Sequence, residues 1–320
     1  MPASGSGKTI ERGYSIAAVS RLTGVSCHTL RVWERRYGFP TSARSPSGQR
    51  RYSPEIVDQL RRISDACHAG RPIRLVIDDL QTGRLDPPAH PPATPFDREV
   101  DHGVGGFLDA IEAGRSSAAC DLLDEWEARF SSLDLISRFI HPAIVEVGER
   151  WYLGRYAIHH ERLATSLLHR RLDALLDRAR RGNPEPRGTV LLCALQGERH
   201  DGALRIVAPV LEIAGWRTES LGVDLPAEAL ARAVAEWEPH AVGISFVLSR
   251  NINKRFDELA AIRDAPILVG GRSLTNYQTL ARRHGLLPLA ADVSSMGEQW
   301  TSQVETWWSE SGRTPPSRSK

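Results

Sequence analysis

The chain has 320 residues, of which 41% are hydrophobic and 25% charged, a composition typical of a globular protein with two or three cores. A single small domain is excluded, and no apolar run approaches the roughly 18 residues that a membrane span needs. The net charge of +2 conceals an asymmetry, because residues 1–75 carry 13 Lys/Arg against 5 Asp/Glu and the remainder 28 against 34. The excess of positive charge in residues 1–75 suits a domain that binds a polyanion. We expect a cytoplasmic protein without a membrane partner.

The cysteines and prolines indicate how the chain is organised. Four cysteines lie far apart without CxxC or Cys/His spacing, so neither a disulfide framework nor a zinc site is indicated. Two Pro-rich stretches, residues 86–95 and 181–188, are predicted to be linkers, since proline removes the backbone donor that helices and strands need. They leave three segments: 1–85, 96–180 and 189–310.

In the first segment, short amphipathic helices are predicted. One begins at Ser15 or Ala17 and ends at Thr23, and Ser26 then caps a second helix that runs through Tyr37,. This is the outline of a helix-turn-helix. The following stretch is rich in Pro, Ser, Gly and Arg, which predicts a wing, and residues 53–54 (Ser-Pro) start a third helix that ends near His68,.

The second and third segments differ in hydrophobic period. In residues 96–180 apolar side chains recur at three- and four-residue intervals, which predicts a four-helix bundle,. In residues 189–310 the apolar runs TVLLCAL, RTESLGV, AVGISFVL and APILVGG alternate with helical stretches. This alternation is typical of a parallel α/β sheet, whose ligands lie beyond the carboxyl ends of the strands. The predicted fold is therefore multidomain, α and α/β.

The basic end carries side chains suited to DNA. The second helix of a helix-turn-helix enters the major groove, and a basic wing can grip phosphate through charge-assisted hydrogen bonds. On pattern alone, a solvated basic face explains the same arginines. The candidate contacts in the helix are His28, Thr29, Arg31, Arg35 and Arg36, and those in the wing are Arg44, Arg50, Arg51 and Tyr52.

Residues 14–53, YSIAAVSRLTGVSCHTLRVWERRYGFPTSARSPSGQRRYS, resemble the amino-terminal domain of MerR-type transcription regulators, and the likeness extends over about 65 residues. The resemblance implies a winged helix-turn-helix that places its second helix in the groove of a double-stranded DNA operator and its wing on phosphate. It assigns Trp33 to the core in preference to a DNA contact. Because MerR-type proteins dimerise on near-palindromic operators, it also implies a homo-oligomer, a dimer or a tetramer.

A histidine follows the first predicted strand of the third segment, within Gly-Glu-Arg-His-Asp-Gly (residues 197–202). A lone histidine there could be a plain surface residue. The later strands end in Ser245 with Leu248 and in the pair Gly270 and Gly271. This series resembles the Rossmann-like cobalamin-binding domain of methionine synthase and cobalamin-dependent mutases, whose motif is D/E-x-H-x-x-G.

That resemblance implies His200 as the lower axial ligand of cobalt and Glu198 as the acceptor that orients its imidazole. It implies that Ser245 hydrogen-bonds the buried nucleotide tail and that Gly270 and Gly271 let backbone pass close to it. One position departs from the motif, since its glycine is Ala203 here and Gly202 stands one residue early. Asp201, Gly202 and Leu248 complete the predicted cofactor set.

Trp151 stands ten residues before Glu161, which resembles the W-x9-E-H signature of the helical cap that covers the upper face of the corrin. Trp151 could also be a core residue of the bundle. Arg162 stands where the signature has histidine, although His159 and His160 precede it. In the light-responsive MerR-type regulators of the CarH kind, a histidine directly after the tryptophan captures cobalt after photolysis, and this chain has Tyr152.

The three resemblances occur in the order of the CarH-like regulators. They predict a non-enzymatic regulator whose oligomeric state and operator binding depend on cobalamin, expected as adenosylcobalamin, with light as the leading signal. The departures at Tyr152, Arg162 and Ala203 leave a second hypothesis open: a light-independent sensor of another corrinoid or tetrapyrrole, or of a partner protein. A third, a corrinoid carrier for methyl transfer, is disfavoured because the chain has a DNA reader and no methyl-donor domain.

Overall fold

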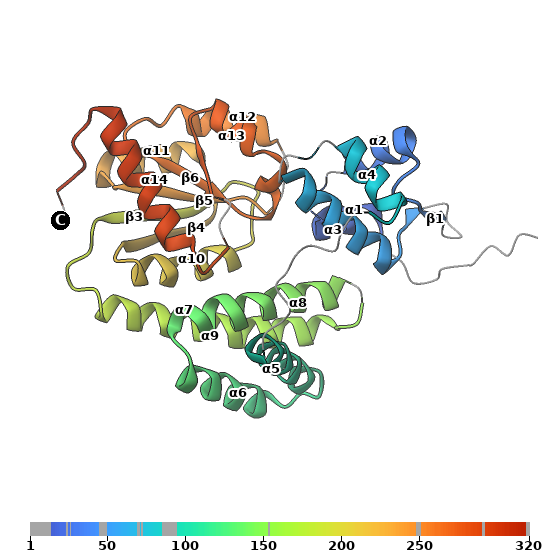
Figure 1. Cartoon of the computed structure of the whole chain (residues 1–320). Helices are drawn as coiled ribbons and strands as arrows, with labels where there is room; N and C mark the ends of the chain where they lie inside the picture. The colour runs from blue at the N-terminus through green and yellow to red at the C-terminus, as the bar shows by residue number, and fades with distance from the viewer. Residues whose placement is uncertain are drawn as a thin grey trace, which may run out of the picture. The chain divides into compact units, whose positions relative to one another are not determined.

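The computed structural model describes residues 14–23, 25, 27–44, 50–68, 71, 73–84, 95–152, 154–247, 251–289 and 292–317. The polypeptide divides into two compact units, residues 1–94 and 95–320 (Figure 1). Among the helices of these ranges, none is long and apolar enough to cross a membrane.

The first unit is a winged helix-turn-helix. Its elements are α1 (Ile16–Thr23), α2 (Cys27–Tyr37), β1 (Ala43–Arg44), β2 (Arg50–Arg51), α3 (Pro54–His68) and α4 (Ile73–Gln81). The two short strands pair antiparallel and form the wing. The predicted bounds of the first three helices are confirmed, whereas α4 was not predicted. Ser53 Oγ accepts a hydrogen bond from the Ile56 N–H at 3.4 Å, as expected of a cap. Gly24 and Ser26, the predicted turn and cap residues before α2, lie outside the described residues.

The second unit begins with the predicted four-helix bundle, in which the third helix is made of three consecutive pieces. The elements are α5 (Pro95–Glu112), α6 (Ser116–Arg129), α7 (Ser132–Asp134), the π-helix η1 (Leu135–Ile140), α8 (His141–Tyr152) and α9 (Ile158–Arg181). Every apolar residue of η1 is buried, and the bundle interior is lined by the periodic apolar positions that predicted it,.

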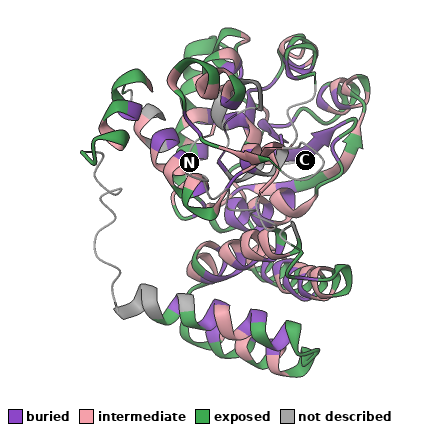
Figure 2. Ribbon diagram, turned by 90° about the vertical axis from the view of Figure 1, so that its right-hand side faces the viewer, coloured by how far each residue is buried: buried purple, intermediate pink, exposed green. Residues whose placement is uncertain are grey.

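A five-stranded parallel sheet follows, in the order β4-β3-β5-β6-β7. The strands are β3 (Thr189–Leu195), β4 (Arg217–Leu225), β5 (Ala241–Ser245), β6 (Ile267–Gly270) and β7 (Leu287–Pro288). The first four coincide with the predicted apolar runs, and the short β7 was not predicted. Figure 2 shows the buried segments running through the middle of the unit, as expected for strands covered on both faces.

Helices cover both faces of the sheet. They are α10 (Gly202–Ile213), α11 (Ala227–Trp237), α12 (Ile252–Ala260), η2 (Arg272–Asn276), α13 (Gln278–Arg283) and α14 (Met296–Ser311). Side chains of α10 and α14 pack on one face, and those of α11, α12 and α13 pack on the other. The bundle and the sheet also share a core, because Ile206, Val210 and Val293 join the bundle's apolar cluster, and α9 lies beside α10 (Figure 1).

Candidate functional site

The strand order creates a switch point between β3 and β5. These strands are neighbours in the sheet, yet the helices that follow them, α10 and α12, pack on opposite faces. The chain therefore leaves the two carboxyl ends in opposite directions, and such a point is where open α/β sheets bind ligands. Residues 196–201 follow β3, and Ser245 is the last residue of β5. The sequence-predicted residues therefore flank the crevice that the topology creates.

Glu198 and His200 form the centre of this site. Glu198 is completely buried, and its Oε1 accepts the backbone N–H of His200 at 3.2 Å and contacts Nδ1 of the same imidazole. Its Oε2 accepts the backbone N–H of Val247 at 3.1 Å, from the segment that follows β5 on the other side of the switch point. The His200 side chain is 58% exposed. With Nδ1 held by a carboxylate, Nε2 is the ring nitrogen left to bind an external group, the arrangement that metal-ligating histidines use.

The end of β4 fixes the loop that carries His200. The Asp224 N–H donates to the Glu198 carbonyl at 2.9 Å, and Asp224 Oδ1 accepts the Gly197 N–H at 2.6 Å. Asp224 has a positive φ of 58°, which is uncommon for a residue with a side chain. Sequence reasoning missed Asp224, although its place at the carboxyl end of a strand was a usable signal.

Ser245 and Gly271 shape the wall formed by β5 and β6. Ser245 is 6% exposed, and its Oγ has no hydrogen-bond partner in the described part of the chain. Gly271 has φ +105°, and a Cβ there would lie 2.4 Å from the Phe246 carbonyl oxygen, so only glycine fits. A Cβ on Gly270 would meet Leu289 at 3.9 Å, which is an ordinary contact. Leu248, the remaining predicted residue here, lies outside the described residues.

Asp201 and Gly202 start α10 and face the bundle. Asp201 binds Arg205 at 2.7 Å, and Arg205 also binds Asp173 of α9 at 2.7 Å. A Cβ on Gly202 would meet His169 of α9 at 3.8 Å, an ordinary contact. The turn into α10 therefore does not require glycine at position 202, nor at position 203, where the family motif has glycine and this chain has alanine. Burial lowers the pKa of His169, a histidine that sequence reasoning did not single out.

The cap residues lie at the α8–α9 corner. Trp151 is 46% exposed, so the alternative that it is a core residue of the bundle is wrong. Glu161 accepts a hydrogen bond from Thr165 Oγ1 at 3.1 Å and lies 3.5 Å from Arg162 Nε. His159 is exposed, whereas His160 Nδ1 accepts the Ala157 N–H at 3.3 Å.

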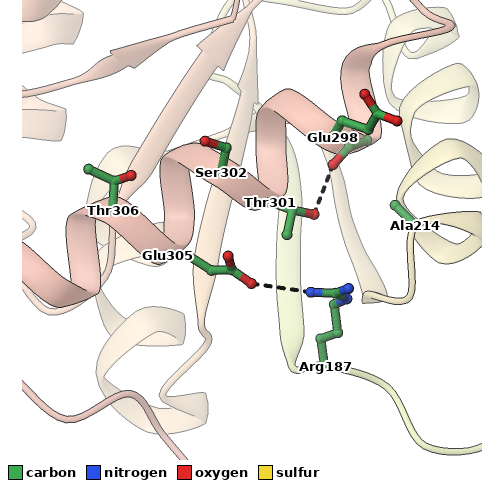
Figure 3. Close-up of a pocket in the computed structure, with 8 residues that line it drawn as sticks. Arg187, Ala214, Glu298, Thr301, Ser302, Glu305 and Thr306 are labelled. Carbon is green, nitrogen blue, oxygen red and sulfur yellow. Dashed lines mark hydrogen bonds and ion pairs between the residues drawn. The ribbon is translucent and has the colours of Figure 1, made fainter.

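A hollow of about 440 Å³ lies elsewhere, between Arg187, Ala214 and α14 (Figure 3). Arg187 precedes β3 and Ala214 ends α10, so the hollow is at the amino edge of the sheet. The Arg187–Glu305 ion pair at 3.2 Å crosses it. Because it is remote from the carboxyl ends of the strands, we do not assign it to the site.

The winged helix-turn-helix exposes four of its predicted DNA contacts fully and three partly. Arg31, Arg35, Arg36 and Arg44 are exposed, and Thr29 and Arg51 are half-buried. Trp33 packs against the core, as predicted. Arg50 is held by Glu34 at 2.7 Å, which ties the wing to α2.

Tyr52 needs a correction. Its side chain is 0% exposed, its backbone pairs with Tyr14, and burial raises its pKa. A phenol enclosed in this way cannot reach a phosphate, so the predicted DNA contact at Tyr52 is wrong and the residue belongs to the core.

Comparison with known proteins agrees with this architecture. Residues 14–81 match the family model of MerR HTH regulatory proteins, and residues 105–176 and 188–301 match two B12 binding domain models. The chain is 32% identical over 302 residues to the HTH-type transcriptional repressor CarH of Myxococcus xanthus, covering 91% of this chain and 97% of CarH. This chain belongs to the CarH-like, cobalamin-binding MerR regulators. It is a DNA-binding transcription regulator that binds cobalamin.

Other similarities divide between the whole regulator and its sensory half. The repressor CarA of Myxococcus xanthus is 32% identical over 297 residues, covering 91% of this CarH-like chain and 93% of CarA. Trimethylamine corrinoid protein 1 of Methanosarcina acetivorans is 23% identical over 176 residues, covering 52% of this chain and 82% of that protein. The solved monomethylamine corrinoid protein of Methanosarcina barkeri shares the fold, with a TM-score of 0.53 and 17% identity over 62% of this chain and 96% of its own.

The carboxyl edge of this CarH-like sheet fits a corrinoid. An exposed imidazole with a carboxylate on its other nitrogen suits cobalt,. Within the described residues the Ser245 hydroxyl has no hydrogen-bond partner, and a ligand could supply one. The close approach between Gly271 and Phe246 leaves no room for a side chain. Among the described residues no cluster of three or more His, Cys, Asp or Glu could hold a metal ion by itself.

Proposed function

We propose that His200 Nε2 would bind the cobalt of a corrinoid, with Glu198 holding the ring, and that the bound cofactor controls operator binding. In this proposal residues 1–85 read DNA, residues 96–180 cap the corrin and residues 189–310 hold it. The observation that carries the proposal is the Glu198–His200 contact at the β3–β5 switch point. A buried carboxylate on Nδ1 fixes the tautomer in which Nε2 carries the lone pair.

Trp151 and Glu161 are proposed to cover the upper face of the corrin. Trp151 is a large apolar side chain left 46% exposed on the cap. Covering it with a ligand would be favourable, because apolar surface would be removed from water. With adenosylcobalamin the cofactor supplies a cobalt–carbon bond that light cleaves, and light is the signal that we propose. Trp151 would exclude water from the bound cofactor in the dark, and illumination would change the surroundings of this side chain.

The cap is proposed to transmit this change to the oligomer. The cap and the sheet share an apolar cluster through Ile206 and Val210 of α10, and the start of α10 directly follows His200. A shift of the cap therefore alters a packed surface, which changes discretely rather than gradually. We propose that it changes a homo-oligomer, dimer or tetramer, and so the spacing of paired DNA readers.

On double-stranded DNA, α2 is proposed to enter the major groove and the wing to contact phosphate. Arg31, Arg35 and Arg36 lie exposed on α2, and Arg44 is exposed on β1. Thr29, Arg50 and Arg51 complete the proposed surface. Arg50 is paired with Glu34 in the free chain, so it would contact phosphate either beside this ion pair or in place of it. These side chains account for the concentration of positive charge in this part of the sequence.

The test is an absorbance spectrum of the purified protein with adenosyl-, methyl- and hydroxocobalamin, before and after illumination. Histidine ligation should give a spectrum distinct from free cofactor, and His200→Ala should abolish that difference, whereas His102→Ala, on the exposed face of α5, should not. Operator mobility and size-exclusion profiles in the dark and the light test the rest. Identical binding with and without cobalamin and light would exclude cofactor control.

A second candidate is a light-independent sensor of another corrinoid, of a different tetrapyrrole or of a partner protein. Position 152 is tyrosine, and His160 Nδ1 is engaged with the Ala157 N–H. Within the described α8–α9 corner, this leaves His159 as the exposed histidine near Trp151. Operator affinity that depends on corrinoid but not on light would favour this candidate. Measurable methyl transfer would instead favour a corrinoid carrier.

A further inference from the structure

Arg255 is a buried cation that has no carboxylate partner among the described residues. It lies in the first turn of α12 and is only 8% exposed. Its Nη2 donates to the Gln196 carbonyl oxygen at 2.8 Å, and its Nη1 is buried without a hydrogen-bond partner in the part of the chain that the structure describes. Neither the sequence motifs nor the proposed function gives this residue a role.

Such an arginine requires an anion. Arginine stays protonated in proteins, and removing its charge from water costs several kcal/mol unless another charge compensates for it. A single carbonyl oxygen supplies one hydrogen bond and no charge. Among the described residues, the positive charge of the Arg255 guanidinium is therefore left uncompensated when no ligand is bound.

The position of Arg255 indicates which ligand meets the requirement. Gln196 directly follows β3 and α12 follows β5, so the side chain spans the same β3–β5 switch point that His200 and Ser245 flank. The unpartnered Oγ of Ser245 lies at the end of β5. Two buried polar groups without partners in the described chain therefore belong to the carboxyl ends of neighbouring strands: Ser245 ends β5, and Arg255 contacts the residue that follows β3. One of them is a cation. Together they suit a ligand segment that carries oxygen atoms and a negative charge.

We propose that Arg255 Nη1 binds the phosphodiester of cobalamin's nucleotide tail. The inference rests on the proposed function, because it requires the corrinoid to bind at this switch point. The phosphodiester is the negatively charged group of the tail, and a charge-assisted hydrogen bond to a phosphate oxygen is among the strong contacts that a guanidinium makes. Arg255 thereby makes the site selective for corrinoids that carry a complete tail.

The test compares cobalamin with cobinamide, a corrinoid without the phosphate, ribose and base, by equilibrium dialysis on the full chain. Arg255→Met should weaken cobalamin binding roughly 10-fold or more, the size expected for a lost charged hydrogen bond, and leave cobinamide binding unchanged. Lys254→Met, on the adjacent 77% exposed side chain, is the matched control and should alter neither. Arg255→Lys keeps the charge without the planar fork and should lose less than Arg255→Met.

Equal losses for the two corrinoids would show that Arg255 only braces the loop at Gln196, and would overturn the inference, as would an unchanged cobalamin affinity. Should Arg255→Met fail to fold, Arg255→Lys alone decides, since a cobalamin-selective loss is still expected. Inorganic phosphate is a second probe: if it raises the Tm of the wild type while the two corrinoids bind equally well, the anion is not the tail. Wild type that binds neither corrinoid would refute the proposed function itself, whereas a retained His200-dependent spectrum without discrimination refutes only the role of Arg255.

Discussion

The polar residues at the carboxyl edge of the sheet differ in whether the described chain itself satisfies them. Glu198 is buried with both oxygens engaged, which is a satisfied state,. Ser245 and Arg255, in contrast, each bury a polar atom without a partner among the described residues. Unsatisfied buried groups are destabilising, so a ligand that supplied partners to these two groups would recover that cost.

Ser245→Ala tests whether one buried hydroxyl lowers the stability of the ligand-free chain and strengthens cobalamin binding. Because the hydroxyl is buried without a partner in the described chain, its removal should leave the ligand-free protein as stable as before, or more stable by up to about 1 kcal/mol. The same change should weaken cobalamin binding about 3- to 10-fold, the contribution of a neutral hydrogen bond. Urea unfolding and equilibrium dialysis measure the two effects. A large loss of stability without cobalamin would mean that the hydroxyl has a structural partner.

At the level of elements, the contact between α9 and α10 joins the cap to the cofactor domain through two ion pairs of different burial. Arg180 Nε lies 3.2 Å from Glu212, a carboxylate that is 0% exposed. Arg205 binds Asp173 and Asp201, which are 56% and 43% exposed. The two arginines are similarly exposed, at 33% and 36%, so the difference lies in the carboxylates. Water screens Asp173 and Asp201 more strongly than the buried Glu212.

Arg180→Met should therefore lower the free energy of unfolding by about 2–3 kcal/mol, since Glu212 would be left as a buried charge. Arg205→Met should cost less than about 1 kcal/mol, which makes it the matched control on the same pair of helices. Urea unfolding of the ligand-free protein followed by circular dichroism measures both. Equal losses would show that burial of Glu212 does not determine the strength of this contact.

Two partly buried histidines of the cap, of which His169 lies at the α9–α10 contact, should make stability depend on pH. Burial lowers the pKa of His169 on α9 and of His141 at the start of α8, so the folded state favours the neutral rings. The unfolded chain takes up protons near the ordinary histidine pKa of about 6.5. The contribution of the two neutral imidazoles to the free energy of unfolding is therefore fully present above about pH 6.5. It is lost as the pH falls through their lowered folded-state pKa values.

We expect the unfolding free energy of the ligand-free chain to fall between pH 7.5 and 5, and His169→Gln to make that decline shallower. His102→Gln, at an exposed position, should leave it unchanged. Urea titrations at a series of pH values measure the slope. A wild-type slope that His169→Gln does not alter would exclude this histidine as a contributor.

At the level of the whole molecule, the two units have separate cores. Among the described residues, none in the apolar cluster of the winged helix-turn-helix belongs to the clusters of the second unit, whereas one cluster spans both the cap and the sheet. The cap and the cofactor domain should therefore unfold together, and the DNA reader by itself.

A ligand raises the stability only of the unit that binds it. Cobalamin should therefore raise the Tm of the transition that belongs to residues 95–320, and operator DNA the Tm of the other. Differential scanning calorimetry with each ligand measures this, and DNA binding should weaken steeply with added salt. One transition that moves with either ligand would show that the two units are thermodynamically coupled.

Much of the fold could be predicted from local pattern. Apolar period and Pro-rich linkers predicted the bundle, four of the five strands and the first three helices, because periodicity reports which face of an element is buried. The two-residue strand β7 was missed because it is too short to show a period. Helix α4 was missed although Ile73, Val76, Ile77 and Leu80 recur at helical spacing, a signal that could have predicted it,. Motif spacing predicted His200, Glu198 and Ser245 as one site, although their roles await the experiments above.

The sequence by itself determined the order of the modules, the charge asymmetry and the residues that the motifs name, because these depend only on neighbours along the chain. Only the tertiary structure decided that Tyr52 is enclosed, that Trp151 is exposed, and that Arg255 and Asp224 meet the His200 loop. Burial and pairing of a side chain depend on segments brought together from distant parts of the sequence. Local pattern carries no record of those contacts.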